Sequence, residues 1–256
     1  MLKDRTMPHK LLFLLGGSAA FDVVAEEFVP AAGGRNSTIV LLMQGGCGWE
    51  KYVPEYTQPW IRRGASRYYP IAPGEDGTLD LDAVSAKLRE ATGIFIGGGH
   101  TPTYHRLYAT EPVRSIIRES YHHGVPIAGC SAGALIAPEI CVLPPDETDD
   151  ASLRIVTGLG LIGELVVGVH FTEGNALPGM LEAMTRTQTR TGLGIDGSAC
   201  AAFEDGQFKR VLGQAVYEIV MTDFEAKTYT MSTANFGRCF SGGRERLHNH
   251  IEEVAK

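Results

Sequence analysis

The stretch Val125-Pro126-Ile127-Ala128-Gly129-Cys130-Ser131-Ala132-Gly133-Ala134 decides the fold, because an apolar run passes directly into the pattern Gly-x-Ser-x-Gly. Such a run predicts a buried parallel strand that turns sharply into a helix and lifts the central serine out of the sheet. Gly129 and Gly133 lack a Cβ, so strand, serine and helix can approach closely. The helix N-terminus offers backbone N–H groups and a positive dipole end, which suit an oxyanion. Ser131 is therefore a candidate nucleophile.

Cys130 is the rival nucleophile, of the kind found in glutamine amidotransferases. The glycines flank Ser131 symmetrically, whereas Cys130 would need them at positions 128 and 132, which are alanines. This register favours serine. The alternative interpretation is a turn made of small residues with no catalytic role.

The composition is that of a globular protein with one substantial core. The chain has 256 residues, of which 44% are hydrophobic and 21% charged, and we expect a single α/β domain over residues 1–256. The net charge is −7 and the Lys and Arg residues are scattered, which argues against nucleic-acid and membrane partners. The cysteines form no C-x-x-C pair, so a reducing, cytoplasmic location is expected.

The N-terminus superficially resembles a signal peptide, because Lys3, Arg5 and Lys10 precede an apolar run at residues 11–15. This run is short for such a segment and Gly16-Gly17 follows at once, so a first core strand ending in a glycine turn is expected. No run approaches the roughly 20 apolar residues of a membrane span.

Apolar runs that end at glycine recur along the first half of the chain, at residues 11–15, 38–43, 93–96 and 126–128. Segments with helical spacing lie between them, at residues 52–63, 81–91 and 111–122. This alternation predicts a mainly parallel central sheet with helices on both faces. Ligands of such sheets bind beyond the carboxyl ends of the strands, where the glycines fall.

The second half is less regular. We expect a polar loop at residues 143–150, an apolar run at residues 160–169 and a helix at residues 180–187. Strands and turns are expected over residues 192–232, with Asp205-Gly206 as a hairpin turn between strands at residues 200–203 and 211–212. Residues 245–256 are expected to form a terminal helix.

Four short segments together resemble one family, the serine peptidases that include aspartyl dipeptidase (dipeptidase E) and cyanophycinase. They read Ile-Phe-Ile-Gly-Gly-Gly-His-Thr at residues 94–101, Gly-Cys-Ser-Ala-Gly-Ala at 129–134, His-Phe at 170–171, and Gly-Leu-Gly-Ile-Asp at 192–196. The resemblance extends over roughly residues 11–216. It implies a class I glutamine-amidotransferase-like, flavodoxin-like sheet.

The resemblance also implies roles for individual residues. Ser131 would attack a peptide carbonyl and His170, at the end of an apolar run, would act as the general base. The oxyanion hole would combine the N–H of Ala132 with an N–H from Gly98 or Gly99. A phosphate cradle is the competing interpretation of the glycine turn, but no P-loop or dinucleotide pattern accompanies it. The residues expected to contact substrate are His100, Thr101 and Arg106.

The third triad member is where the sequence departs from its relatives, which commonly carry Asp-Glu where this chain has Asp196-Gly197. A carboxylate is needed to orient the imidazole and stabilise the imidazolium. Asp196 is the nearest, and we expect it to emerge at a strand end near the active edge. The other candidates are Asp146, Glu147, Asp149, Asp150 and Glu173.

A second departure concerns specificity. Relatives of the cyanophycinase type place arginines shortly after the His-Phe pair, and this chain has none there, so cleavage of the β-aspartyl-arginine polymer is not expected. An acidic substrate side chain would need a cation, for which Arg106, Arg186 and Arg190 are candidates.

No cofactor or metal is expected. Residues 146–150 lack the glycine and the terminal glutamate of a calcium-binding EF-hand loop, and His248-Asn249-His250 matches a nuclease motif by letters alone.

The sequence therefore predicts a serine peptidase or dipeptidase acting on short peptides, aspartyl or β-aspartyl ones first, through a Ser-His-acid acyl-enzyme. The partner would be a small peptide, and a homodimer is the candidate assembly. The alternatives are an amidase or esterase on the same scaffold and a non-catalytic binding protein with a degraded triad.

Overall fold

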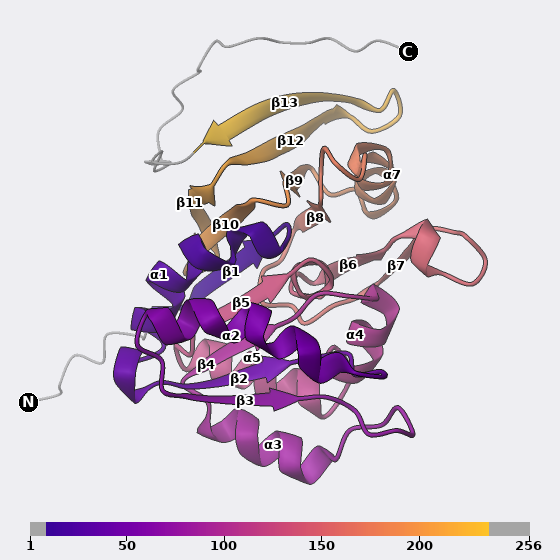
Figure 1. Ribbon diagram of the computed structural model, residues 1–256. Helices are drawn as coiled ribbons and strands as arrows, with labels where there is room; N and C mark the ends of the chain where they lie inside the picture. Colours follow the sequence, from indigo (N-terminus) through magenta and orange to yellow (C-terminus); the bar gives the residue numbers. More distant parts are fainter. Residues whose placement is uncertain (1–8, 236–256) are drawn as a thin grey trace, which may run out of the picture.

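The structure, a computed structural model, describes residues 9–235 and is built on a seven-stranded sheet. Its strands lie in the order β11-β10-β1-β5-β4-β2-β3 (Figure 1). Their bounds are β1 (Leu11–Leu15), β2 (Thr38–Leu42), β3 (Arg67–Ile71), β4 (Gly93–Ile96), β5 (Ile127–Cys130), β10 (Ala199–Glu204) and β11 (Gln207–Gly213). Strands β1 to β5 run parallel, whereas β10 and β11 are antiparallel. The sheet is therefore mixed.

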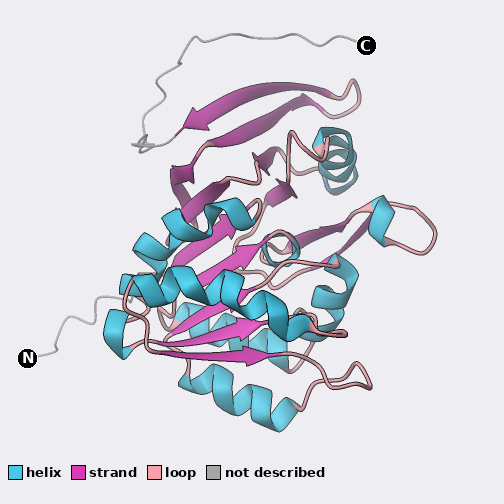
Figure 2. Ribbon diagram, in the orientation of Figure 1, coloured by secondary structure: helices cyan, strands magenta, loops and turns pink. Residues whose placement is uncertain are grey.

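Helices cover both faces of this sheet, as the apolar runs predict (Figure 2). One face carries α1 (Phe21–Ala31) and α2 (Val53–Arg62), and the other carries α3 (Leu81–Glu90), α4 (Thr101–Tyr108), α5 (Val113–His122) and α6 (Ala132–Ile136). Alternate side chains of β1 enter the two cores: Phe13 and Leu15 pack with α1 and α2, while Leu12 and Leu14 pack on the opposite side. Burial of each such side chain contributes roughly 1.5–3 kcal/mol.

The strands of the second half of the chain do not all join the central sheet. Strands β10 and β11 extend it, whereas four others form a second sheet. A four-stranded sheet has the order β13-β12-β9-β8 and lies above the central sheet in Figure 1. Its strands are β8 (Leu165–Val169), β9 (Thr191–Ile195), β12 (Ala215–Asp223) and β13 (Thr228–Asn235), and α7 (Leu177–Thr187) packs on it through Met180 and Met184. The turn at Asp205-Gly206 joins β10 to β11 as predicted, and both residues have positive φ.

Two expected segments are found, with more detail than the sequence indicated. The apolar run at residues 160–169 is a strand only from Leu165 onward, because Gly160 has a φ of +71° and the chain turns there. The expected polar loop at residues 143–150 lies within a hairpin of β6 (Ile140–Leu143) and β7 (Arg154–Thr157). Its tip holds the short 3-10 helix η4 (Pro145–Glu147). The described residues also form the 3-10 helices η1 (Ser18–Ala20), η2 (Gly34–Asn36) and η3 (Trp49–Tyr52).

The predictions for the two ends of the chain have different outcomes. The run at residues 11–15 is β1, a core strand as predicted. The terminal helix at residues 245–256 and the His248-Asn249-His250 segment lie outside the described residues. Among residues 9–235, no helix has the length and apolar character needed to cross a membrane.

Candidate active site

Ser131 occupies a strained turn between β5, which ends at Cys130, and α6, which begins at Ala132. Its φ of 50° and ψ of −111° are unusual for a non-glycine residue. The turn is held by the Ser131 N–H, which donates to the carbonyl of Leu15 at 2.9 Å. A Cβ at Gly129 would lie 2.5 Å from the carbonyl oxygen of Gly133, and one at Gly133 would lie 2.4 Å from that of Ile96. Both glycines of the pattern are therefore required by close backbone packing.

His170 follows the last residue of β8, and its Nε2 lies 3.0 Å from Oγ of Ser131. The residue has a φ of 46°, and its carbonyl accepts a 2.6 Å hydrogen bond from the Gly174 N–H. The ring fits against the glycine turn after β1, where a Cβ at Gly17 would lie 3.1 Å from Cε1. The structure thus brings together the two side chains that the sequence placed as nucleophile and base.

Cys130, the rival nucleophile, faces the core beneath the turn and is 3% exposed. Burial, with a smaller contribution from the charge of Glu55, raises the pKa of its thiol to about 12. At neutral pH on the order of 10⁻⁵ of such a thiol is ionised, and the thiolate is the reactive form.

We predict that Cys130 resists alkylation in the folded protein. Iodoacetamide at neutral pH is expected to modify exposed Cys47, which serves as the internal control, and to spare Cys130. Peptide mapping by mass spectrometry would measure both rates. Modification of Cys130 as fast as that of Cys47 would contradict this assignment.

Two of the three expected oxyanion donors have no hydrogen-bond partner in the described chain. The N–H of Ala132, at the start of α6, has no hydrogen-bond partner within residues 9–235, and neither has that of Gly99. The N–H of Gly98, in contrast, donates to Oη of Tyr56 at 3.0 Å. Gly98 is therefore not a free donor, and the pair left for an oxyanion is Ala132 with Gly99.

Two buried tyrosines that the sequence did not indicate fix this glycine turn. Tyr56 accepts from the Gly98 N–H, while Tyr104 donates to the Gly98 carbonyl at 3.1 Å. Burial is the main cause that raises the pKa of both phenols, so both hydroxyls stay protonated. A Cβ at Gly99 would lie 2.5 Å from Oε1 of Gln44, and only glycine fits there at a φ of 147°.

Asp196 follows the end of β9, as expected, but its carboxylate does not bind His170. Its buried carboxylate accepts from the N–H and Oγ1 of Thr172, at 3.0 and 2.8 Å, and from Oη of Tyr217 at 3.2 Å. Burial, with the charges of Asp196 and Glu173 as smaller causes, raises the pKa of Tyr217. No hydrogen bond or ion pair joins Asp196 to His170 in the described chain. The expected direct contact is absent, and Asp196 instead anchors the loop after His170.

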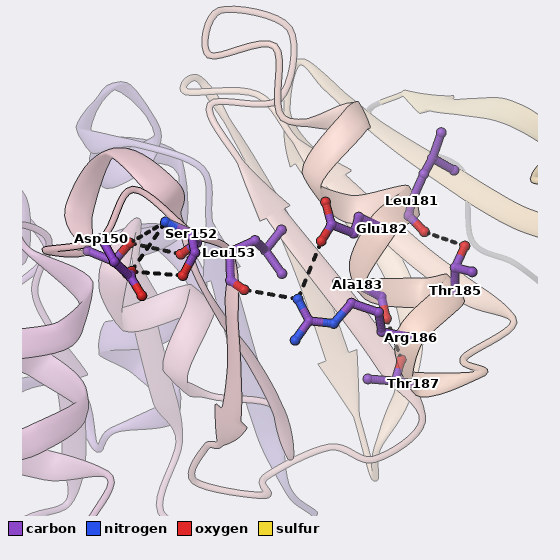
Figure 3. A network of polar contacts seen from close by, with 10 residues as sticks. Asp150, Ser152, Leu153, Leu181, Glu182, Ala183, Thr185, Arg186 and Thr187 are labelled. Atoms are coloured by element: carbon purple, nitrogen blue, oxygen red, sulfur yellow. Dashed lines mark hydrogen bonds and ion pairs between the residues drawn. The ribbon is translucent and has the colours of Figure 1, made fainter.

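The acidic residues of the β6–β7 hairpin also serve other contacts. Oε2 of Glu147 accepts from the N–H of Thr101 at 2.6 Å. Asp150 accepts from Ser152 and pairs with Arg154, and hydrogen bonds from these two residues lower its pKa to about 2. Figure 3 shows Asp150 turned toward its own loop. Asp146 and Asp149 are exposed on the same loop, and within residues 9–235 no three His, Cys, Asp or Glu side chains are grouped to hold a metal ion.

The residues expected to contact substrate are engaged within the fold. Both ring nitrogens of His100 have partners, Oγ1 of Thr103 and the carbonyl of Glu147, and the side chain of Thr101 is buried. With Glu147, they tie the β6–β7 hairpin to the start of α4.

The candidate cations are likewise occupied or placed elsewhere. Arg106 donates to the carbonyl of Gly77 at 3.0 Å. Arg186 joins α7 to the hairpin by donating to the carbonyl of Leu153 at 2.9 Å (Figure 3). Arg190 borders a groove that also contains Glu139 and Glu164.

Comparison with known proteins adds a family and a fold. The model of peptidase family S51 matches residues 75–211. A cyanophycinase of Nostoc sp. is 35% identical over 169 residues, which cover 64% of this chain and 57% of that protein. A cyanophycinase of Synechococcus elongatus is 31% identical over 221 residues, or 83% of this chain and 68% of that protein. The crystal structure of a peptidase from an acI-B1 Actinobacterium superposes with a TM-score of 0.66 at 19% identity, covering 91% of this chain and 96% of that one.

Proposed function

This chain belongs to peptidase family S51, and on that premise we propose that it is a serine peptidase. The observation that carries the proposal is the 3.0 Å contact between Oγ of Ser131 and Nε2 of His170 at a strained strand-to-helix turn. A nucleophile within hydrogen-bond reach of its base is the arrangement that covalent catalysis needs.

The proposed reaction passes through an acyl-enzyme. Oγ of Ser131 attacks the substrate carbonyl while Nε2 of His170 takes its proton. The negative charge on the carbonyl oxygen is stabilised by the N–H groups of Ala132 and Gly99, the two candidate donors that have no partner within residues 9–235. His170 then gives its proton to the leaving amine, and water releases the acyl group by the same steps in reverse order.

The same chemistry supports the two alternatives to different degrees. Triad geometry does not distinguish an amide from an ester, so an amidase or esterase remains the second candidate. A non-catalytic binding protein is disfavoured by the 3.0 Å contact between Ser131 and His170, because that contact pairs a nucleophile with its base.

Short aspartyl or β-aspartyl peptides are the substrate class that we propose. The support is the similarity to proteins named cyanophycinase, although the match spans only 57% of the Nostoc protein. Arg106 and Arg186 donate to backbone carbonyls, and Arg186 also pairs with Glu182. Residues 172–177 contain no arginine, and polymeric cyanophycin is therefore proposed to be a poor substrate.

The sheet type is a proposal as well. The order β3-β2-β4-β5 corresponds to the 2-1-3-4 order of flavodoxin-like sheets, with β1 in the next position. This order supports the glutamine-amidotransferase-like architecture.

A substrate panel tests the proposed function. Purified protein would be assayed on Asp-X dipeptides, a β-Asp-Arg dipeptide, neutral dipeptides and a small ester, with Ser131→Ala as the blank. Asp-X peptides are expected to be cleaved at least about tenfold faster than neutral ones, a margin that pocket contacts commonly provide. Rapid turnover of β-Asp-Arg would overturn the exclusion of cyanophycin, and hydrolysis of the ester alone would favour the esterase.

A further inference from the structure

One ring nitrogen of His170 has no hydrogen-bond partner in the described chain. Nε2 contacts Ser131, whereas Nδ1 has no hydrogen bond or ion pair within residues 9–235. For Nε2 to accept the serine proton, the ring proton must reside on Nδ1, and an acceptor there selects that tautomer and stabilises the imidazolium. The site as a serine hydrolase therefore calls for a carboxylate beside Nδ1.

The space beside Nδ1 is bordered by Gly197 and Glu173. A Cβ at Gly197 would lie 3.6 Å from Nδ1 of His170 and 3.2 Å from Oε1 of Glu173. The imidazole nitrogen and the glutamate carboxylate thus flank one point, which glycine leaves empty. Oε1 of Glu173 is held there by the Gly197 N–H, which donates to it at 3.0 Å.

The other titratable groups near this point are already occupied. Asp196, at the end of β9, accepts from Thr172 and from Tyr217 of β12. Cys130, at the end of β5, is buried beneath the turn. Glu173 keeps an exposed carboxylate, with Gly197 as its one described hydrogen-bond partner.

We infer that Glu173 is the positioning carboxylate of His170 and occupies the place that a side chain at position 197 would fill. This inference rests on the proposed serine hydrolase function. Glu173 lies three residues after His170, on the loop that Asp196 anchors, and its exposed side chain can rotate about its torsions toward Nδ1. When Nε2 takes the proton of Ser131, the carboxylate stabilises the resulting positive ring.

Glu173→Gln tests the inference, because the amide oxygen can still accept from the Gly197 N–H while the charge is lost. The rate at which a fluorophosphonate phosphonylates Ser131, with loss of fluoride, is expected to fall on the order of 10- to 100-fold. This is less than for a buried triad aspartate because Glu173 is exposed. Glu164→Gln is the matched control: it removes the same charge just before β8, at the opposite end of the strand from His170. It is expected to react as the unmodified chain does.

A spectroscopic readout separates positioning from a structural role. The ¹⁵N shifts of the His170 ring report its tautomer, and we expect the Nδ1–H form to dominate in the unmodified chain and to lose population in Glu173→Gln. Adding Gly197→Glu to Glu173→Gln is expected to restore both the tautomer and the rate, because the new side chain starts 3.6 Å from Nδ1.

Fluorophosphonate labelling of the unmodified chain distinguishes failure of this inference from failure of the proposed function. If the unmodified chain reacts with the fluorophosphonate while Glu173→Gln matches it in rate and tautomer, the inference is overturned and the function stands. If the unmodified chain does not react at all, the function is overturned. The tautomer measurement needs no substrate and still decides the role of Glu173.

Discussion

Replacing Ser131 by alanine is expected to lower the rate of peptide hydrolysis on the order of 10⁴- to 10⁶-fold, because the variant has no oxygen to form the acyl-enzyme. The backbone should tolerate the change: the Ser131 N–H bond to Leu15 and the glycines on either side are unaffected by loss of the hydroxyl. Steady-state kinetics on the best dipeptide of the substrate panel would measure the loss, with KM showing whether binding survives.

The matched control for this variant is Ser115→Ala, on an exposed position of α5. It removes the same hydroxyl from a site remote from β5 and should retain full activity. Hydrolysis by Ser131→Ala at more than about one hundredth of the unmodified rate would rule out Ser131 as the nucleophile, given the size of effect expected for such a group.

Replacing His170 should have an effect of similar size, on the order of 10⁴-fold or more, since Ser131 then lacks a proton acceptor. Asparagine is the better replacement than alanine, because His170 has a φ of 46° and asparagine adopts that conformation several times more often. His170→Asn therefore isolates the loss of the imidazole from backbone strain. The acylation rate at neutral pH is the measurement.

His123→Asn controls for the loss of a histidine. This residue caps the C-terminal end of α5, where its Nδ1 lies 2.8 Å from the carbonyl oxygen of Glu119. It should acylate as the unmodified chain does. Retention of more than a tenth of the acylation rate by His170→Asn would mean that another group deprotonates Ser131, because removing a general base typically costs about 10²-fold at the least.

Local patterns predicted the part of the fold that positions the nucleophile. Strands β1, β2, β4 and β5 are continuous apolar runs because they are buried on both faces, and that burial is visible in sequence. Strand β3 was not predicted, since it lies at the sheet edge and mixes Arg67 and Pro70 with half-buried residues. Helix α1 has buried residues at helical spacing, so a signal for it was present in the sequence.

The sequence likewise indicated some residues of the candidate site but not the contacts that they make. Apolar runs indicate the strand ends that carry Ser131 and His170. They do not indicate that β5 and β8 belong to different sheets, which the fold brings together at this contact. The two hydrogen-bond partners of Asp196 could not be predicted from the sequence. Tyr217 lies on β12, the strand beside β9, and Thr172 lies on the loop after His170. Likewise, the bond that removes Gly98 from the free donors comes from Tyr56, 42 positions away. Such contacts depend on tertiary packing rather than local pattern.

Mapping the adduct of a fluorophosphonate on the full chain tests whether Ser131 is the nucleophile. Intact-mass and peptide mass spectrometry should show one adduct per chain, on Ser131, which disappears in Ser131→Ala and forms much more slowly in His170→Asn. An adduct on Cys130 or on any other residue, or no adduct on a chain that cleaves peptides, would contradict the account.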